Sequence, residues 1–277
     1  MSGTLVVVAT PIGNLDDLSP RAAAALCAVD LVLAEDTRRT GRLLAHVGSD
    51  APQRSLHGHN ERASIEQVLA RLSDGARIAL VSDAGTPAVS DPGARLLAAC
   101  VEAGVRIEPI PGPSAALAAL VVSGLPTDRV AFDGFLPRKG RARRDRLDDI
   151  AAEERTVVVF LAPHRAAADL TDLAQACGRD RRAVLCRELT KLHEQVVHGE
   201  LGELVEHAQA GLRGELTLVL AGAEPPAADQ VADADLAAQV ETRVAAGATR
   251  RDAIQAVAEA SRVSKRRVYQ AVLDADR

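Results

Sequence analysis

Short apolar runs alternate with amphipathic helical stretches along most of the chain, and this alternation constrains the fold more than any other feature. In the first part, the runs expected to form strands are Leu5–Ala9, Leu31–Ala34, Arg77–Ser82 and Val105–Pro109. The helical patterns cover Leu18–Ala28, Thr37–His46, Asn60–Leu72, Ala94–Ala103 and Ser114–Val122. Because continuous Val, Leu and Ile runs between helices are typical of strands buried on both faces, we predict a parallel sheet covered by helices.

A second set of the same kind follows Gly124-Leu125-Pro126, which we interpret as a linker. Its expected strands are Val130–Phe132, Thr156–Leu161, Ala183–Arg187, Gln195–His198 and Leu216–Ala221. Its expected helices are Ala142–Ala152, Ala166–Ala176 and Leu201–Ala210. The sequence therefore predicts an α/β protein with two α/β domains, residues 1–124 and 125–226. Residues 227–277 are expected to form a helical basic tail, with Thr249 and Ser264 as the N-caps of two short helices.

Apolar residues make up 47% of the 277 residues, enough for a sizeable core, but aromatic residues are scarce. The chain has no Trp, three Phe and one Tyr, Tyr269. Any contact with RNA is therefore expected to depend on charge and shape, because a platform of stacked aromatic side chains is lacking. The net charge of −5 argues against a general nucleic-acid-binding protein, so local clusters of positive charge matter more than the average.

The cysteines and the N-terminal segment suggest a cytoplasmic protein. Cys27, Cys100, Cys177 and Cys186 are far apart and form no CxxC pair, which favours neither a zinc site nor a disulfide framework and suits a reducing compartment. The first residues lack the basic segment of a signal peptide and are expected to form a strand. No apolar run is long enough to span a membrane.

Small and polar residues follow several of the expected strands. The segment Thr10–Asn14 lacks the GxGxxG pattern of dinucleotide-binding proteins, and no Walker A motif occurs. Ser82–Pro87 lets a ligand approach the backbone closely and presents Asp83 as an acceptor, which suits S-adenosylmethionine because this ligand is cationic and has no pyrophosphate. The alternative is structural: Asp83 begins a turn and Asp91 caps a helix. Ser114 either caps the next helix or faces the same crevice.

Two further segments concentrate polar side chains. The pattern His57-Gly58-His59 followed by Glu61 is compatible with a metal site, but no partner motif completes one, so we expect no metal and a loop that contacts substrate. The segment 34–40 contains Asp36, which is either a functional group or the cap of a helix.

Two basic clusters offset the acidic average. Residues 137–146 hold six positive side chains against one negative, and the tail adds a second cluster. The residues expected to contact RNA are Arg138, Lys139, Arg141, Arg143, Arg144, Lys265, Arg266 and Arg267. The alternative is that each cluster is a solvated surface.

Seven motifs occur in a fixed order: TPIGNLDDLS, AEDTRRTG, LHGHNE, VSDAGTPAVSDPG, PGPSAALAAL with SGLP, GFLPRKGR and RELTK. Together they resemble the bacterial small-subunit ribosomal RNA (cytidine-2′-O)-methyltransferase family of the tetrapyrrole-methylase superfamily. The resemblance spans about Leu5 to Leu220 and fits the tail more loosely. It implies two α/β domains, S-adenosylmethionine in the cleft between them, a homodimer, and the ribose of a cytidine in 16S ribosomal RNA as the target, with the assembled small subunit as the expected partner.

The resemblance also implies which residues hold the cofactor. They are Ile12, Asp83, Ala84, Gly85, Thr86, Ser114, Ala115, Leu161, Leu189 and Thr217. One position departs from the family, because Leu161 stands where relatives usually carry a glutamate.

Transfer to a ribose hydroxyl benefits from a proton acceptor, and the candidates are His59, Glu61 and Asp36. Two alternatives remain open: a tetrapyrrole (precorrin-type) methyltransferase, which needs no arginine-rich loop, and a non-catalytic RNA-binding assembly factor, which need not bind cofactor.

Overall fold

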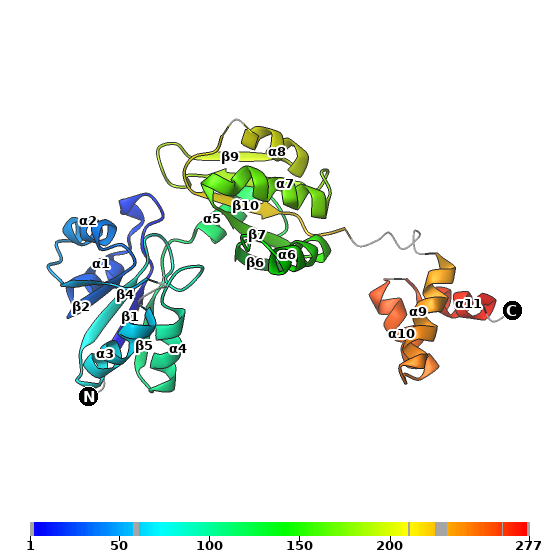
Figure 1. Ribbon diagram of the computed structural model, residues 1–277, viewed down its shortest axis with the longest axis horizontal. Helices are drawn as coiled ribbons and strands as arrows, with labels where there is room; N and C mark the ends of the chain where they lie inside the picture. Colours follow the sequence, from blue (N-terminus) through cyan, green and yellow to red (C-terminus); the bar gives the residue numbers. More distant parts are fainter. Residues whose placement is uncertain (1–2, 58–60, 210, 225–231, 262, 276–277) are drawn as a thin grey trace. The chain divides into compact units, whose positions relative to one another are not determined.

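The computed structural model describes residues 3–57, 61–209, 211–224, 232–261 and 263–275. The chain divides into two compact units, Met1–Ala223 and Glu224–Arg277. The first unit contains two sheets, and the second contains only helices in its described part (Figure 1). Each unit has its own apolar core.

The first sheet is fully parallel, as the sequence predicts. Its strands are β1 (Thr4–Val8), β2 (Leu31–Ala34), β3 (Gln53–Ser55), β4 (Arg77–Val81) and β5 (Arg106–Ile110), in the order β3-β2-β4-β1-β5. A short 3-10 helix, η1 (Leu15–Asp17), follows β1. The edge strand β3 has no apolar run and was not predicted, because its three residues are polar and only partly buried.

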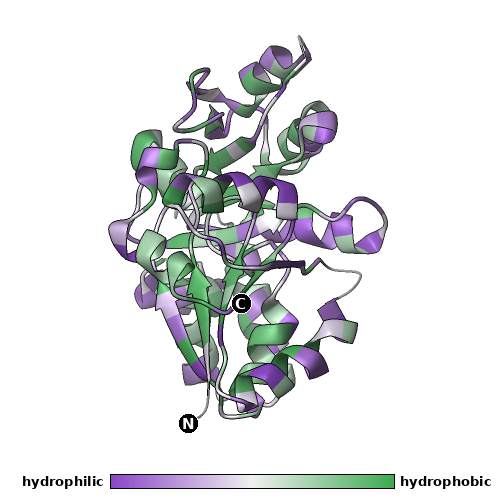
Figure 2. Ribbon diagram, turned by 90° about the vertical axis from the view of Figure 1, so that its left-hand side faces the viewer, coloured by the Kyte–Doolittle hydropathy of each residue, from purple (hydrophilic) through white to green (hydrophobic). Residues whose placement is uncertain are grey.

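Helices cover both faces of this sheet. The helices α1 (Pro20–Cys27) and α2 (Thr37–Val47) bury Leu26 and Leu43 in one core cluster. The helices α3 (Glu61–Ser73) and α4 (Ala94–Glu102) bury Leu72 and Leu96 in another. Figure 2 shows the hydrophobic colouring along the strands and the alternation of hydrophilic and hydrophobic residues along the helices. The strands are thus held between two apolar layers, and their carboxyl ends stay open at one edge.

The second sheet is mixed. Its strands are β6 (Val130–Phe135), β7 (Thr156–Leu161), β8 (Arg182–Arg187), β9 (Gln195–Glu200) and β10 (Leu216–Leu220), in the order β6-β7-β10-β8-β9. Only the β6–β7 pair is parallel. The strands β8 and β9 pair directly because only the loop 188–194 connects them, and an antiparallel pair needs no crossover helix.

Helices lie on both faces of the second sheet as well. The helices α6 (Arg141–Ala152), α7 (Ala166–Cys177), which follows the 3-10 helix η2 (Pro163–Arg165), and α8 (Leu201–Gln209) share one core cluster. The helix α5 (Ala115–Ser123) packs on the opposite face, where Ala119 and Leu120 meet β7, β8 and β10. The predicted division at residue 124 assigned α5 to the first domain, but its packing belongs to the second sheet.

The tail unit contains α9 (Asp233–Ala245), α10 (Arg250–Ala260) and α11 (Lys265–Ala275). The two predicted N-caps are present: Thr249 Oγ1 accepts from the amide of Asp252, and Ser264 Oγ accepts from the amide of Arg267, both at 3.2 Å. The helix α9 completes the core of this unit and was not predicted individually. In the described part of the chain, no helix is both long and apolar enough to cross a membrane.

Candidate active site

The first unit contains a cavity of about 530 Å³ at the carboxyl ends of the parallel strands, between the two sheets. We call it the cleft. The residues that line it are Ile12, Glu35, Arg39, Asp83, Ala84, Gly85, Thr86, Val89, Ser90, Asp91, Ser114, Ala115, Ala116, Phe135, Phe160, Leu161, Ala162, Pro163, His164, Glu215, Leu216 and Thr217. These residues come from the ends of β1, β2, β4 and β5 and from β6, β7 and β10. We call the first sheet with its helices the first lobe and the second sheet with its helices the second lobe, and both lobes contribute to one site.

The loop after β4 forms the floor of the cleft. Thr10 and Gly85 exchange two backbone hydrogen bonds of 2.9 and 3.0 Å, which join the ends of β1 and β4. Gly85 has φ +78°, a conformation that strains any residue with a Cβ atom. Ala88 and Ser90 in the same loop adopt positive φ despite being non-glycine residues. Such backbone conformations are enriched at ligand sites, where the surrounding structure maintains them.

The two lobes approach each other closely on either side of the cleft. A Cβ atom on Gly134 of β6 would collide with Ser90 Oγ, and one on Gly13 would collide with the side chain of Lys191. The amide of Asn14 donates to Thr190 Oγ1 at 3.2 Å, next to Gly13. Glycine at positions 13 and 134 is therefore what allows the lobes to close around the cleft.

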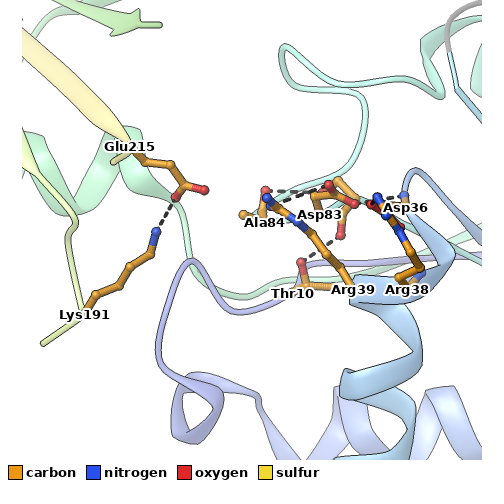
Figure 3. A network of polar contacts seen from close by, with 9 residues as sticks. Thr10, Asp36, Arg38, Arg39, Asp83, Ala84, Lys191 and Glu215 are labelled. Atoms are coloured by element: carbon orange, nitrogen blue, oxygen red, sulfur yellow. Dashed lines mark hydrogen bonds and ion pairs between the residues drawn. The ribbon is translucent and has the colours of Figure 1, made fainter. Parts of the chain in front are cut away.

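Asp83 is fixed at the end of β4 by two partners. Its Oδ1 accepts from the backbone amide of Asp36 at 2.9 Å, and its Oδ2 lies 3.6 Å from the guanidinium of Arg39 (Figure 3). From the other lobe, Lys191 Nζ bonds Glu215 at 3.0 Å. Charged side chains from both lobes thus face the cleft in fixed positions.

Two carboxyl groups in the cleft have raised pKa values. Burial raises the pKa of Asp91 to about 6, and the nearby carboxylates of Glu35 and Asp83 add to the shift. Burial also raises the pKa of Glu35, with a further contribution from Asp83. The described lining therefore includes four carboxyl groups, with Glu215 as the fourth, against the single guanidinium of Arg39 and the imidazole of His164. This charge favours a cationic ligand.

The structure brings nine of the ten expected cofactor residues to this cleft, from Ile12 of the first lobe to Thr217 of the second. The exception is Leu189, which is buried in the core cluster beside Ile12 and does not line the cleft. Leu161 is 1% exposed and contributes an apolar wall to the cleft. Ser114 both lines the cleft and caps α5, because its Oγ accepts from the amide of Leu117.

The structure corrects the prediction that Glu61 accepts a proton. Its side chain is buried, and its Oε1 accepts from the backbone amides of Arg95 and Leu96 at 2.9 and 3.1 Å. Glu61 therefore satisfies the free amides at the start of α4, a structural role. The alternative given to Asp91, that of helix cap, belongs to Glu61, since Gly93 precedes α4 and provides no side-chain cap.

The other two expected proton acceptors are Asp36 and His59. Asp36 caps α2 through the amide of Arg38, and its carboxylate pairs with the Arg38 guanidinium at 2.6 Å. This pairing holds the pKa of Asp36 well below its usual range, which makes it a weak base, and Asp36 does not line the cleft. His59 lies outside the described residues.

Sequence reasoning missed the two carboxyl groups with raised pKa values. Glu35 lies within the segment 34–40, but the sequence predicts a proton acceptor only at its neighbour Asp36. The missing signal was burial: Glu35 directly follows the wholly buried strand β2, and Asp91 faces other acids that are distant in sequence.

The predicted RNA-binding residues near α6 separate into two groups. Arg138, Lys139, Arg141 and Arg144 are exposed, and they follow Phe135, which lines the cleft. Arg143 is different, because its side chain is only 11% exposed and its guanidinium donates to both Asp169 and Asp172 at 2.6 to 2.8 Å. Its cation is already neutralised, so the prediction that it contacts RNA is wrong.

The tail shows the same division. Lys265 and Arg266 are exposed at the start of α11. Arg267 pairs with Asp233 at 3.0 Å and links α11 to α9, and its contact with RNA stays a prediction. Among the described residues, no group of His, Cys, Asp and Glu is arranged to hold a metal ion.

Comparison with known sequences decides the family. The sequence model of the tetrapyrrole (corrin/porphyrin) methylases matches residues 4–205. The chain belongs to the tetrapyrrole methylase family. The matched segment includes most of the residues that line the cleft, and the helical tail lies outside it.

Within this family, the chain is similar over its whole length to proteins named ribosomal RNA small subunit methyltransferase I. One from Synechocystis is 46% identical over 273 residues, which are 98% of this chain and 98% of the relative. One from Mycobacterium tuberculosis is 48% identical over 279 residues, which are 100% of this chain and 96% of the relative.

Solved structures of other tetrapyrrole methylases share the fold. A uroporphyrin-III C-methyltransferase from Thermus thermophilus, complexed with S-adenyl homocysteine, aligns with a TM-score of 0.58 and 21% identity. The alignment covers 79% of this chain and 97% of that protein. At this identity the likeness supports the two-lobed α/β architecture alone.

Proposed function

We propose that the protein transfers a methyl group from S-adenosylmethionine to the 2′-hydroxyl of a cytidine ribose in small-subunit (16S) ribosomal RNA. The observation that carries the proposal is the acidic cleft at the strand ends, in a chain whose full-length relatives are named ribosomal RNA methyltransferases. The proposal puts this activity in the cytoplasm, with the assembled small subunit as the partner.

The cleft fits the cofactor on chemical grounds. S-adenosylmethionine carries a sulfonium and an ammonium, and the carboxyl groups of Asp83, Asp91 and Glu35 provide the opposite charge. Gly85 and its neighbours let a ligand approach the backbone, while Ile12 and Leu161 offer apolar walls for the uncharged parts. We propose that the nine lining residues named above hold the cofactor, and that Leu189 supports Ile12 from behind.

When bound, the cofactor supplies an electrophilic methyl group. The residues of the chain have three tasks: to orient the ribose, to exclude water and to accept the proton of the 2′-hydroxyl. Glu35 and Asp91 suit the last task better than Asp36 or Glu61, because both line the cleft and burial raises their pKa values, which makes each carboxylate a stronger base. Such a base contributes about 10²–10⁴-fold to a rate.

The exposed cations after β6 support an RNA substrate. Phe135 lines the cleft, and four exposed cations follow it in the sequence. They are Arg138, Lys139, Arg141 and Arg144. Phosphate groups bind such clusters with an affinity that falls as salt rises.

We also propose that the protein acts as a homodimer. The support is apolar surface on α5, where Leu117 is 63% and Val121 is 79% exposed. Exposed apolar side chains that share one helix face are typical of protein contacts. Sedimentation equilibrium tests this, and a monomer at micromolar concentration would refute it.

The test of the function is methyl transfer in vitro. Purified protein, methyl-labelled S-adenosylmethionine and small ribosomal subunits from a strain without the enzyme should give label in 16S RNA. Nuclease digestion should locate the label on the ribose of one cytidine. Label in an added tetrapyrrole but not in RNA would support the precorrin-type alternative, and cofactor binding without transfer to either would leave an assembly factor.

A further inference from the structure

The tail unit contains a groove of about 560 Å³ between α10 and α11. We call it the basic groove. It is lined chiefly by Arg250, Arg251, Ile254, Lys265, Arg266 and Tyr269. The remaining lining residue is an amide, Gln255, so the described lining holds four cations and no carboxylate.

The four cations of the basic groove lie in the first turns of two helices, where positive charge lowers helix stability. Arg250 and Arg251 begin α10, and Lys265 and Arg266 begin α11, directly after the N-caps Thr249 and Ser264. The amino end of a helix carries partial positive charge, so cations in the first turn reduce helix stability. Two helix starts with cations around one groove make a surface that is complementary to anions.

These cations differ in their present partners. Arg250 lies 3.7 Å from Glu241, so part of its charge is offset. Arg251, Lys265 and Arg266 are exposed, and they supply most of the positive field of the groove. In contrast, the neighbouring Arg267 forms an ion pair with Asp233.

Apolar side chains stand beside the cations in the same pattern on both helices. Tyr269 follows Lys265 by one helical turn, and Ile254 follows Arg250 by one turn, so each apolar side chain lies on the face of its own cation. Tyr269 is 55% exposed, which is a large fraction for an aromatic side chain in a chain with so few. A basic groove with one open aromatic ring matches the chemistry of an unpaired nucleotide, whose base stacks while its phosphates pair with cations.

We propose that the basic groove binds single-stranded RNA, with one unpaired base stacked on Tyr269 and the adjoining phosphates on Arg251, Lys265 and Arg266. The proposal deepens the proposed function, because it names the form of RNA that the tail holds. It rests on the proposed function only for the identity of the bound RNA. It also amends the expectation that the tail is restricted to charge and shape.

The chain itself provides the probe. Because the chain has no Trp and one Tyr, its intrinsic fluorescence comes from Tyr269 when it is excited at a wavelength that its three Phe residues do not absorb. Titration with a short unstructured oligouridine should quench this fluorescence and saturate, after correction for absorbance by the bases. A duplex RNA with the same number of phosphates should quench little, because its bases are already stacked.

Variants separate stacking from charge. With end-labelled oligouridine and anisotropy as the readout, Tyr269→Ala should weaken binding about tenfold, whereas Tyr269→Phe should retain most of it. Arg251→Ala with Lys265→Ala should lower the salt slope by roughly 1 to 1.5, since each single-strand phosphate contact contributes about 0.7. The matched control is Arg243→Ala, an exposed cation of α9 outside the groove, which should change the affinity little.

Three results would overturn the proposal: quenching by duplex RNA that equals quenching by oligouridine, wild-type affinity in Tyr269→Ala, or polyglutamate binding as tight as RNA, which would identify an acidic protein surface. Titration of the same preparations with S-adenosylmethionine keeps the two proposals apart. If the wild-type protein does not bind S-adenosylmethionine, the proposed function alone is refuted. If it does not bind oligouridine, the proposal for the basic groove alone is refuted.

Discussion

The cleft of the first unit and the basic groove of the tail are similar in volume but opposite in charge. The cleft brings Glu35, Asp83 and Asp91 together from loops far apart in sequence. The basic groove collects its cations from two adjacent helix starts. One site therefore depends on the whole two-sheet fold, whereas the other depends on a small helical unit with its own core.

This difference suggests a division of tasks. A cationic cofactor is favoured in the acidic cleft, and polyanionic RNA is repelled from it unless cations elsewhere hold the RNA in place. The exposed cations after β6 and those of the tail provide these contacts in our account. We therefore expect substitutions in the cleft to weaken cofactor binding, and substitutions in the basic surfaces to weaken RNA binding without changing cofactor binding.

The largest effect is expected at the floor of the cleft. Asp83→Ala with Gly85→Val should abolish measurable cofactor binding, because it removes a carboxylate and forces a β-branched residue to φ +78°. Titration calorimetry with S-adenosylmethionine measures this.

The matched control for backbone strain is Asp148→Ala with Gly104→Val, which removes an exposed acid and strains a glycine at φ +67° away from the cleft. The control should bind cofactor normally. If it loses binding as well, strain alone explains the first result, and near-native affinity in the cleft variant would mean that the cofactor binds elsewhere.

Deletion of Glu224–Arg277 tests the independence of the two sites. We expect the first unit to fold and to bind cofactor unchanged, because its core shares no cluster with the tail. The KM for small subunits should rise about 100-fold, since a linked second site adds avidity, while kcat at saturating substrate changes little. Aggregation or lost cofactor binding would show that the tail is structural, and an unchanged KM would remove it from RNA binding.

How far the sequence predicted these features depends on the distance between the residues involved. The strands of the first sheet other than β3, and the N-caps Thr249 and Ser264, follow from local runs. Nine cleft residues follow from motifs and from the family resemblance that these motifs carry. The roles of Glu61 and Arg143 did not follow, because their partners, the amides of α4 and the carboxylates of α7, lie about 25 or more residues away. A motif can mark a polar residue, but only tertiary packing decides whether that residue faces a ligand or a neighbouring helix.

The basic loop near the cleft gives a smaller effect. Replacing Arg138, Lys139, Arg141 and Arg144 with Ala should weaken RNA binding about tenfold and lower its salt slope, with cofactor affinity unchanged. By contrast, Arg143→Ala should lower the free energy of unfolding by roughly 3 kcal/mol, because the buried carboxylate of Asp169 loses its 2.8 Å partner and keeps only Arg165 at 3.5 Å. Binding at several salt concentrations and thermal unfolding distinguish the two variants. A stable Arg143→Ala protein that loses only RNA affinity would reverse our assignment.

The smallest effect concerns pH. Asp91 has a pKa of about 6, so its carboxyl group gains a proton as pH falls through 6 and the cleft becomes less negative. Affinity for the cationic cofactor should therefore fall a few-fold between pH 7.5 and pH 5, and Asp91→Asn should flatten this dependence. The same raised pKa makes folded Asp91 hold its proton more tightly than the unfolded chain does, so its contribution to stability decreases as pH rises from about 4 to 6. A steep profile that persists in Asp91→Asn would point to another group.

Mass spectrometry of 16S RNA tests most directly whether the acidic cleft methylates ribosomal RNA, as we propose. The RNA would come from cells that lack the gene and express either the wild-type chain, the cleft variant Asp83→Ala with Gly85→Val, or its matched control. We predict one ribose-methylated cytidine with the wild type and the control, and its absence with the cleft variant. The same methylation of 16S RNA in all of these cells, and in cells that lack the gene and express no chain, would contradict the proposal.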